Sequence, residues 1–444
     1  MTDTTLHLAK KTPGGSAPQR AGGLAPLPGD AGGGATQPFV LRHPSLLIFI
    51  ACLAVFTLTI TVLAEGVGIG VISTSFVKTL GKTLCLCLVA LAMDLVWGYC
   101  GILSLGHMAF FGLGGYAIGM WLMYARTELI VLENLANAPL PPTVQEISDG
   151  IAGQIFGVVG ASEFPPIWAV AHSLPLQLAA VVLVPGLLAF VFGWLAFRSR
   201  VTGVYLSILS QAMTLALALY LFQNDSGLRG NNGLSGLQNL PGLDAVPQST
   251  VSMWFFWGSA LALGLGYLLC VWLVSGKFGS VIRAIRDDET RARFLGYPVE
   301  AYKLVVFTLT AVIAAIAGAL YYPQAGIINP AELAPIASIY LAVWVAIGGR
   351  GRLYGAVIGA AFVSLVSTWF TGGQAPDLNL GFATVKWVDW WTVLLGVSFV
   401  AVTLFAPKGI GGLVDLWTDR QSPKRRGAPL GPDAGALQEQ EAEK

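Results

Sequence analysis

The chain between residues 46 and 64 reads LLIFIACLAVFTLTITVLA, an apolar stretch that holds no charged side chain. A helix of roughly 20 such residues can cross the hydrocarbon core of a bilayer. Because the stretch begins too far along the chain for a usual secretory signal peptide, we predict an uncleaved first spanning helix. Comparable stretches recur and predict an all-α, polytopic transmembrane bundle of about ten spans. The expected spans lie near residues 46–64, 79–97, 107–125, 174–196, 202–222, 251–274, 302–320, 335–347, 354–371 and 390–406.

The composition supports this fold class. Of the 444 residues, 55% are hydrophobic and 11% are charged, whereas a soluble domain carries about 25% charged residues. The net charge of +1 gives no general attraction to nucleic acid or to an acidic partner. All five cysteines fall in apolar stretches without the spacing of a zinc site or a disulfide framework, so we interpret them as small core residues.

The two ends of the chain differ from its apolar middle. Residues 1–44 and 416–444 hold few large apolar side chains, so we predict flexible tails on either side of a transmembrane domain at 45–415. Most of the 25 basic residues fall on one side if both termini are cytoplasmic, as the positive-inside rule requires. In that orientation 126–173 is a periplasmic loop, whose prolines exclude one continuous helix, and 276–301 is a cytoplasmic loop.

Residues 98–119 read GYCGILSLGHMAFFGLGGYAIG, which is unusually rich in Gly and polar residues for an apolar region. Irregular polar backbone at membrane depth is tolerated only where it is buried in protein or lines a cavity. This segment could therefore be partly re-entrant, and Ser104, Gly106 and His107 are candidates for lining a solute path. For His107 the alternative is a buried histidine that bonds a neighbouring helix.

Two further polar features leave alternatives open. Asp94 is an acidic residue well inside a predicted span, where an ionisable side chain suggests function; it could instead pair with Lys78, Lys82 or a helix end. Residues 224–233, NDSGLRGNNG, predict a turn with positive φ values. This turn is either a simple hairpin loop or the polar mouth of a path, with Asn231 and Asn232 as candidates.

Residues 276–302, GKFGSVIRAIRDDETRARFLGYPVEAY, predict a charged helix at 278–295 that ends near Gly296 and Pro298. The helix is either merely solvated or docks in a cleft on a partner subunit and transmits motion. The coupling candidates are Arg283, Arg286, Asp287, Asp288, Glu289 and Gly296.

No pattern in the sequence predicts an enzyme. Gly81-Lys82-Thr83 looks like the end of a nucleotide-binding loop, but Phe76 occupies the position of that loop's first glycine. The four histidines and five cysteines form no metal or nucleophile pattern. We therefore predict no catalytic residue, no metal and no cofactor in this chain.

Several motifs together resemble one family. The 98–119 segment, the run IRAIRDDETRARFLGYPVEAYKL at 282–304 and the ending LFAPKGIGGL at 404–413 are similar to the permeases of branched-chain amino acid and urea ABC importers. The run AGALYYPQAGIINPAELAPIASIYLAVWVAIGGRGRLYGAVIGA at 317–360 resembles the urea-type branch in its AGIINP and VWVAIGGRGRLYGA portions. One departure is Tyr340, because the family often carries a glutamate there.

The resemblance implies a permease subunit of an ATP-driven importer in the bacterial inner membrane. It implies a second homologous permease subunit, two cytoplasmic ATPase subunits that bind the ATP, and a periplasmic solute-binding protein. It favours urea or a short amide as solute, with Gln324 and Asn329 as further path candidates. The alternatives are the same machine importing branched-chain amino acids, and a stand-alone channel or secondary transporter for a small neutral solute.

Overall fold

The computed structural model describes residues 43–136, 143–159, 166–372, 378–379, 384–385, 387–405, 409–410 and 412. The predicted tails lie outside these residues, apart from 43 and 44. The described chain is helical almost throughout, which confirms the all-α prediction. The helices are α1 (Pro44–Leu63), α2 (Thr74–Asp94), α3 (His107–Ala136), α4 (Val144–Val159), α5 (Leu174–Arg198), α6 (Val204–Phe222), α7 (Gln248–Ser275), α8 (Lys277–Asp287), α9 (Glu289–Phe294), α10 (Val299–Ala325), α11 (Pro335–Gly348), α12 (Leu353–Thr371) and α13 (Trp387–Phe405).

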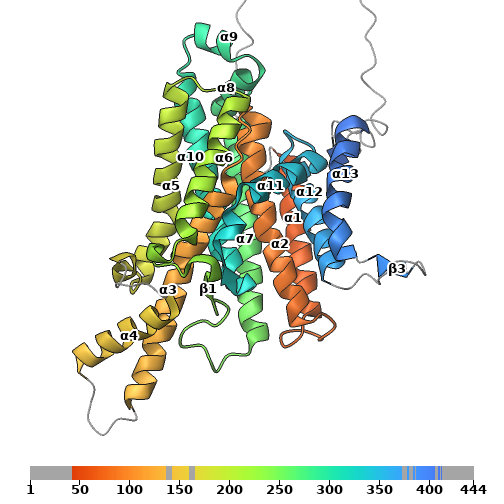
Figure 1. The fold of residues 1–444 in the computed structure, drawn as a ribbon. Helices are drawn as coiled ribbons and strands as arrows, with labels where there is room; N and C mark the ends of the chain where they lie inside the picture. Colours follow the sequence, from red (N-terminus) through yellow and green to blue (C-terminus); the bar gives the residue numbers. More distant parts are fainter. Residues whose placement is uncertain are drawn as a thin grey trace, which may run out of the picture. The chain divides into compact units, whose positions relative to one another are not determined.

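Eight of the described helices are long and apolar enough to cross a membrane, namely α1, α2, α3, α5, α6, α7, α10 and α12. Two shorter apolar helices, α11 and the Trp390–Ala401 part of α13, lie where the eighth and tenth spans were predicted. All ten predicted apolar segments are therefore helical, and eight of them have full spanning length. In Figure 1, α8 and α9 lie at one end of the bundle, beyond α7 and α10.

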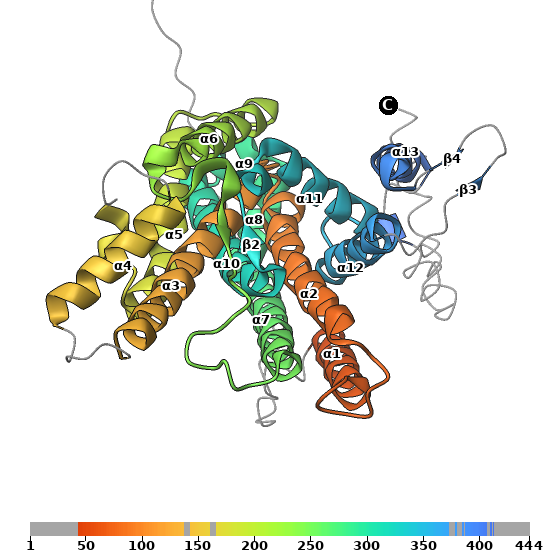
Figure 2. The ribbon, with the colours of Figure 1, turned by 60° about the horizontal axis from the view of Figure 1, so that its bottom comes forward.

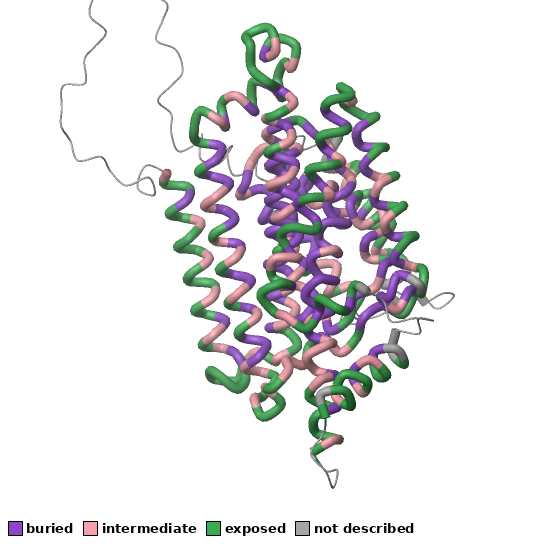
Figure 3. Tube along the Cα trace, turned by 90° about the vertical axis from the view of Figure 1, so that its left-hand side faces the viewer, coloured by how far each residue is buried: buried purple, intermediate pink, exposed green. Residues whose placement is uncertain are grey.

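Helix α10 forms the centre of the bundle and packs against α3, α5, α2 and α7 (Figures 1 and 2). Two glycines allow the closest of these approaches. A side chain at Gly318 of α10 would collide with the Phe111 carbonyl oxygen, and one at Gly114 of α3 would collide with the Ala315 carbonyl oxygen. Small residues let spanning helices approach each other in this way. Figure 3 accordingly shows the buried residues concentrated on the central helices.

Helix α1 lies at the rim of the bundle, where most of its side chains are exposed. The Trp257 indole of α7 donates a hydrogen bond of 2.9 Å to the Thr61 hydroxyl, and the rings of Phe49 and Tyr267 are stacked. Cys52 is exposed on α1, whereas the other four cysteines are buried. The interpretation of all five as core residues was therefore wrong for Cys52, because most of α1 is not covered by other described helices.

Two loop regions differ in extent from the prediction. Helix α3 continues to Ala136, so the expected loop at 126–173 begins with helical turns, and α4 follows as a separate helix packed on α3. The Gly-rich segment 98–119, for which a re-entrant course was open, is irregular only at 100–106, between the π-helix that ends α2 and the start of α3, and its residues from His107 on are part of α3. Helix α2 passes into a π-helix at Leu95–Tyr99, and Gly101 then adopts φ +79°.

Two short antiparallel strand pairs complete the described structure. Strand β1 (Leu234–Ser235) pairs with β2 (Ile327–Ile328), and β3 (Leu378–Asn379) pairs with β4 (Thr384–Val385). The first pair joins the chain after α6 to the chain after α10. It therefore brings two predicted polar segments together.

Candidate functional site

His107 is the first residue of α3 and is fully buried. Its Nδ1 lies 3.2 Å from the Ser104 hydroxyl, and its Nε2 lies 3.1 Å from the Thr310 hydroxyl of α10. The rings of Phe110 and Phe307 meet the imidazole edge to face. Both ring nitrogens thus have protein partners in this conformation. This is the arrangement expected if His107 is a buried histidine that bonds a neighbouring helix.

The start of α3 is surrounded by polar side chains from three other helices. The Leu105 N–H donates to the Ser210 hydroxyl of α6 at 2.9 Å, and the Met108 N–H donates to the Ser338 hydroxyl of α11 at 3.2 Å. Gly106 lies against Thr214 of α6. The Met108 N–H, one of the first amide groups of α3 that have no partner inside the helix, is therefore satisfied by a neighbouring helix. We call Ser104, His107, Ser210, Thr310 and Ser338 the central polar cluster.

The polar turn after α6 lies beside the chain that follows α10. Asn231 and Asn232 are exposed in a short 3₁₀ turn, and a side chain at Gly233 would collide with the Ile328 carbonyl oxygen. The Asn329 side chain accepts a hydrogen bond of 2.9 Å from the Ala331 N–H and caps the next turn. Three of the path candidates therefore lie in adjacent segments. The predicted positive φ values are confirmed, although they occur at Arg229 and three glycines and not at the asparagines.

Gln324 is buried near the end of α10, apart from the central polar cluster. Its Nε2 donates to the Leu320 carbonyl at 2.7 Å and to the Ser259 hydroxyl of α7 at 3.0 Å. Its Oε1 is buried without a hydrogen-bond partner among the described residues and lies against Gly81 of α2. The structure thus places this candidate between α2, α7 and α10.

Glu332 was not predicted as a functional residue. It lies in the 3₁₀ turn Pro330–Leu333, close to Lys82, Tyr322 and Tyr116. The hydroxyls of Tyr116 and Tyr322 are buried without a formed hydrogen bond in the described chain. Burial raises the pKa of the Glu332 carboxyl, and the Tyr322 hydroxyl and the Lys82 charge oppose this rise. The available sequence signal was a single acidic residue in the otherwise apolar run NPAELAP.

Replacing Glu332 with glutamine should change how stability depends on pH. A carboxyl whose pKa is raised by folding holds its proton more tightly in the folded state, so stability falls as pH rises from the unfolded pKa through the folded pKa. We expect the thermal midpoint of the wild type in detergent to fall over this range, and that of E332Q to fall less. The exposed carboxyl of Glu65 provides the control, E65Q. Equal pH dependence in E332Q and wild type would contradict the prediction.

Asp94 is fully buried at the end of α2. Its Oδ1 accepts a hydrogen bond of 2.7 Å from the Gly351 N–H in the loop between α11 and α12. In the described chain neither Lys78 nor Lys82 forms an ion pair with it. The pairing with a lysine that the sequence allowed is therefore not formed, because both lysines lie several turns earlier on α2 and Lys82 interacts with Glu332 instead.

Arg286 joins the charged segment to the bundle. Its Nη1 donates a hydrogen bond of 2.8 Å to the Gly98 carbonyl in the π-helix, while Asp287 pairs with the same guanidinium at 2.8 Å. Gly98 has no room for a side chain, because Asp94 and Gly351 lie directly against it. We call Arg286, Gly98, Asp94 and Gly351 the α8 junction. It connects α8, the end of α2 and the α11–α12 loop.

The charged segment is two helices, so the prediction of one helix at 278–295 was wrong. Asp288 has an extended backbone (φ −156°, ψ 96°), and its carboxylate accepts a hydrogen bond of 3.0 Å from the Arg291 N–H. It therefore ends α8 and caps the start of α9. Gly296, with φ +87°, follows α9 and has no neighbour within 4 Å of an added side chain.

Helix α9 is tied to the first turns of α10. Arg293 bridges Glu289 at 2.9 Å and Glu300 at 2.7 Å, and Lys303 contacts Glu289 at 2.5 Å. A cavity of about 150 Å³ lies between this segment, the irregular connection near Gly101 and the start of α6. Arg283 donates to the Gly279 carbonyl of its own helix and, at 3.5 Å, to the Val274 carbonyl of α7. Arg283, Arg286 and Glu289 are thus the coupling candidates that contact the bundle.

The described residues contain no group of three His, Cys, Asp or Glu side chains that could hold a metal ion. The central polar cluster pairs one imidazole, that of His107, with the hydroxyls of Ser104 and Thr310.

The eight long apolar helices of the described residues define a multi-pass membrane protein. The family described as branched-chain amino acid transport system, permease component, matches residues 75–403, and the chain belongs to this family.

Curated relatives include several permease proteins. The high-affinity branched-chain amino acid transport system permease protein LivM of Escherichia coli K12 is 26% identical over 243 residues, which is 50% of this chain and 53% of the relative. The autoinducer 2 import system permease protein LsrC of Photorhabdus laumondii is 27% identical over 154 residues, 32% of this chain and 43% of the relative. The chain spans about half the length of the curated relatives that it matches. No solved structure matches the chain.

Proposed function

We propose that this chain is the permease subunit of an ATP-driven importer. It would work in the bacterial inner membrane with a second homologous permease subunit, two ATPase subunits that bind the ATP, and a periplasmic solute-binding protein. The observation that carries the proposal is the Arg286–Gly98 hydrogen bond, which joins a charged surface segment to the end of a buried spanning helix. The family to which the chain belongs supports the same assignment.

The mechanism follows from the α8 junction. Closure of the ATPase subunits would push on α8 and α9, which we take to be cytoplasmic, as are both termini. Arg286 would pass this motion to the π-helix, and the irregular connection from Gly101 leads from there to the central polar cluster. ATP can shift the permease between inward-open and outward-open states only if it favours one of them through such a contact. His107 would then meet solute when the helices around it separate.

For the solute we propose urea or a short amide. Support comes from the AGIINP and GGRGRLYGA sequences and from a central polar cluster made of hydroxyls and one imidazole. A neutral amide needs donors and acceptors of this kind and no counter-charge. Branched-chain amino acids are the second candidate, which the names of the family and of LivM favour. An amino acid zwitterion would require charges or helix dipoles along the path, and the start of α3 at His107 supplies one such dipole for a carboxylate.

The test is uptake of labelled urea and labelled leucine into proteoliposomes. We expect no uptake by this chain alone and ATP-dependent uptake once the second permease, the ATPases and the binding protein are added. Uptake of urea above leucine supports the urea assignment, and the reverse result selects the amino acid. Uptake by the chain alone would overturn the importer proposal, because it would indicate a self-sufficient channel or secondary transporter.

A further inference from the structure

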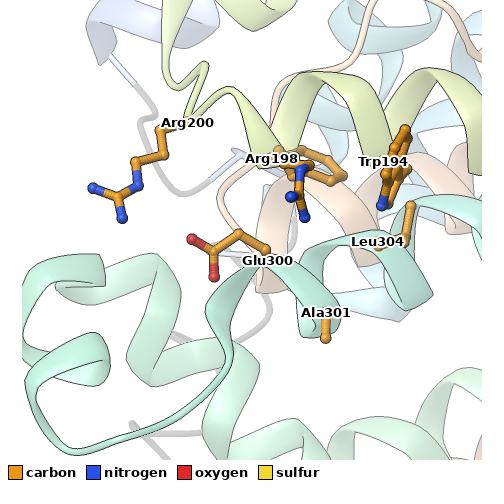
Figure 4. A pocket seen from close by; sticks show the side chains of 7 residues that line it. Trp194, Arg198, Arg200, Glu300, Ala301 and Leu304 are labelled. Atoms are coloured by element: carbon orange, nitrogen blue, oxygen red, sulfur yellow. The ribbon is translucent and has the colours of Figure 1, made fainter.

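We infer that a cavity between the end of α5 and the start of α10 binds the phosphate of an anionic phospholipid. The cavity has a volume of about 390 Å³. Trp194 and Arg198 line it from α5, Arg200 lines it from the turn that follows, and Glu300 and Leu304 line it from α10 (Figure 4). None of these residues belongs to the central polar cluster or to the α8 junction.

The cavity carries an unbalanced positive charge. The Arg198 guanidinium lies over the Trp194 ring at 5.7 Å from its centroid, and neither Arg198 nor Arg200 forms an ion pair with a carboxylate in the described chain. Glu300, the carboxylate in the lining, is already paired with Arg293 at 2.7 Å. Two arginines are therefore available to an anion, and the planar guanidinium suits the bidentate binding of phosphate.

The surroundings of the two arginines select a lipid as the source of that phosphate. Arg198 is the last residue of the apolar spanning helix α5, whose side chains Phe190, Val191 and Leu195 are exposed just before it. Tryptophan is enriched at the membrane–water interface. We therefore place Trp194, and the cavity that it lines, at the level of the lipid headgroups. A headgroup held by Arg198 and Arg200 would thus have its acyl chains along an apolar helix face. Basic cavities between spanning helices bind anionic lipid headgroups in this manner.

The turn after α5 presents Arg200 at the mouth of the cavity. Arg200 has φ +56°, in the left-handed region that a non-glycine residue rarely adopts. Its amide donates to the Phe197 carbonyl at 3.0 Å, which closes the turn. The two arginines are therefore held on one tight turn; in Figure 4 their guanidinium groups lie on either side of the Glu300 carboxylate, so Arg200 reaches a phosphate on Arg198 by turning its side chain toward the cavity.

Native mass spectrometry of the purified full chain tests the inference. The protein would be titrated with phosphatidylglycerol or with phosphatidylethanolamine of the same acyl chains. We expect wild type to retain phosphatidylglycerol about tenfold better, which corresponds to about 1.4 kcal/mol. The double variant R198A/R200A should lose this preference, and R198K/R200K should keep part of it because charge remains without the guanidinium fork.

The matched control is R283A/R291A, which removes two arginines from α8 and α9 outside the cavity. It should bind phosphatidylglycerol like wild type. If R198A/R200A cannot be purified as a monodisperse protein, R198A and R200A are measured singly, and each should weaken the preference. Four outcomes would overturn the proposal. Wild type could bind both lipids equally, or the cavity variants could bind phosphatidylglycerol as wild type does. The control could lose the preference as much as R198A/R200A, or millimolar inorganic phosphate could displace the lipid.

Discussion

Replacing Arg286 with alanine should leave the bundle folded and strongly reduce solute uptake per ATP hydrolysed. The variant removes the hydrogen bond of 2.8 Å to the Gly98 carbonyl, by which the described part of α8 contacts the π-helix. A hydrogen bond from a charged group contributes about 1.5–3 kcal/mol. If that contact transmits the ATP-driven change, its loss lowers the coupling ratio about 10- to 100-fold, since about 1.4 kcal/mol corresponds to a factor of ten.

The measurement is the ratio of labelled uptake to phosphate release in the reconstituted importer. R291A is the matched control, because the Arg291 side chain belongs to the same segment and is 80% exposed. R286K should keep part of the coupling, since lysine can still donate one hydrogen bond to Gly98. A normal ratio of uptake to hydrolysis in R286A would show that the α8 junction does not carry the motion.

The positions of the spanning helices could be predicted because their cause is local. An apolar stretch in a bilayer must satisfy its backbone within itself, so each one becomes a helix. The short span expected at 335–347 likewise matches α11, whereas the extension of α3 to Ala136 depends on packing with distant segments and could not be predicted. The break at Asp288 had a local signal, an aspartate followed by Glu289 and two arginines, because aspartate is a preferred helix cap.

The contacts of the candidate site could not be predicted, because their partners are far apart in sequence. His107 bonds Thr310 across 203 positions, and Asp94 bonds Gly351 across 257. The sequence identified His107 and Asp94 as unusual residues, since polar groups at membrane depth need partners. It could not identify which partner each would have. Glu332 was missed for the same reason, because its interest comes from Lys82 and the tyrosines packed around it.

Replacing Asp94 with alanine should destabilise the protein more than any other carboxyl substitution in the described bundle. The side chain is fully buried and accepts the Gly351 N–H at 2.7 Å. Alanine would leave the partly buried Gly351 N–H without this acceptor, which costs about 1–3 kcal/mol.

The thermal midpoint in detergent, followed by fluorescence-detected size exclusion, measures this loss. D149A removes an exposed carboxylate of α4 and should leave the midpoint unchanged. The midpoint of D94N should fall between those of D94A and D149A, because the amide oxygen can still accept the Gly351 N–H while the charge is gone.

The thermal midpoint also distinguishes Asp94 from Arg286. R286A should lose coupling with a near-normal midpoint. D94A should lose both coupling and stability, since Asp94 holds the α11–α12 loop against which Gly98 packs. A midpoint for D94A equal to that of D149A would mean that the Gly351 loop is held by other contacts.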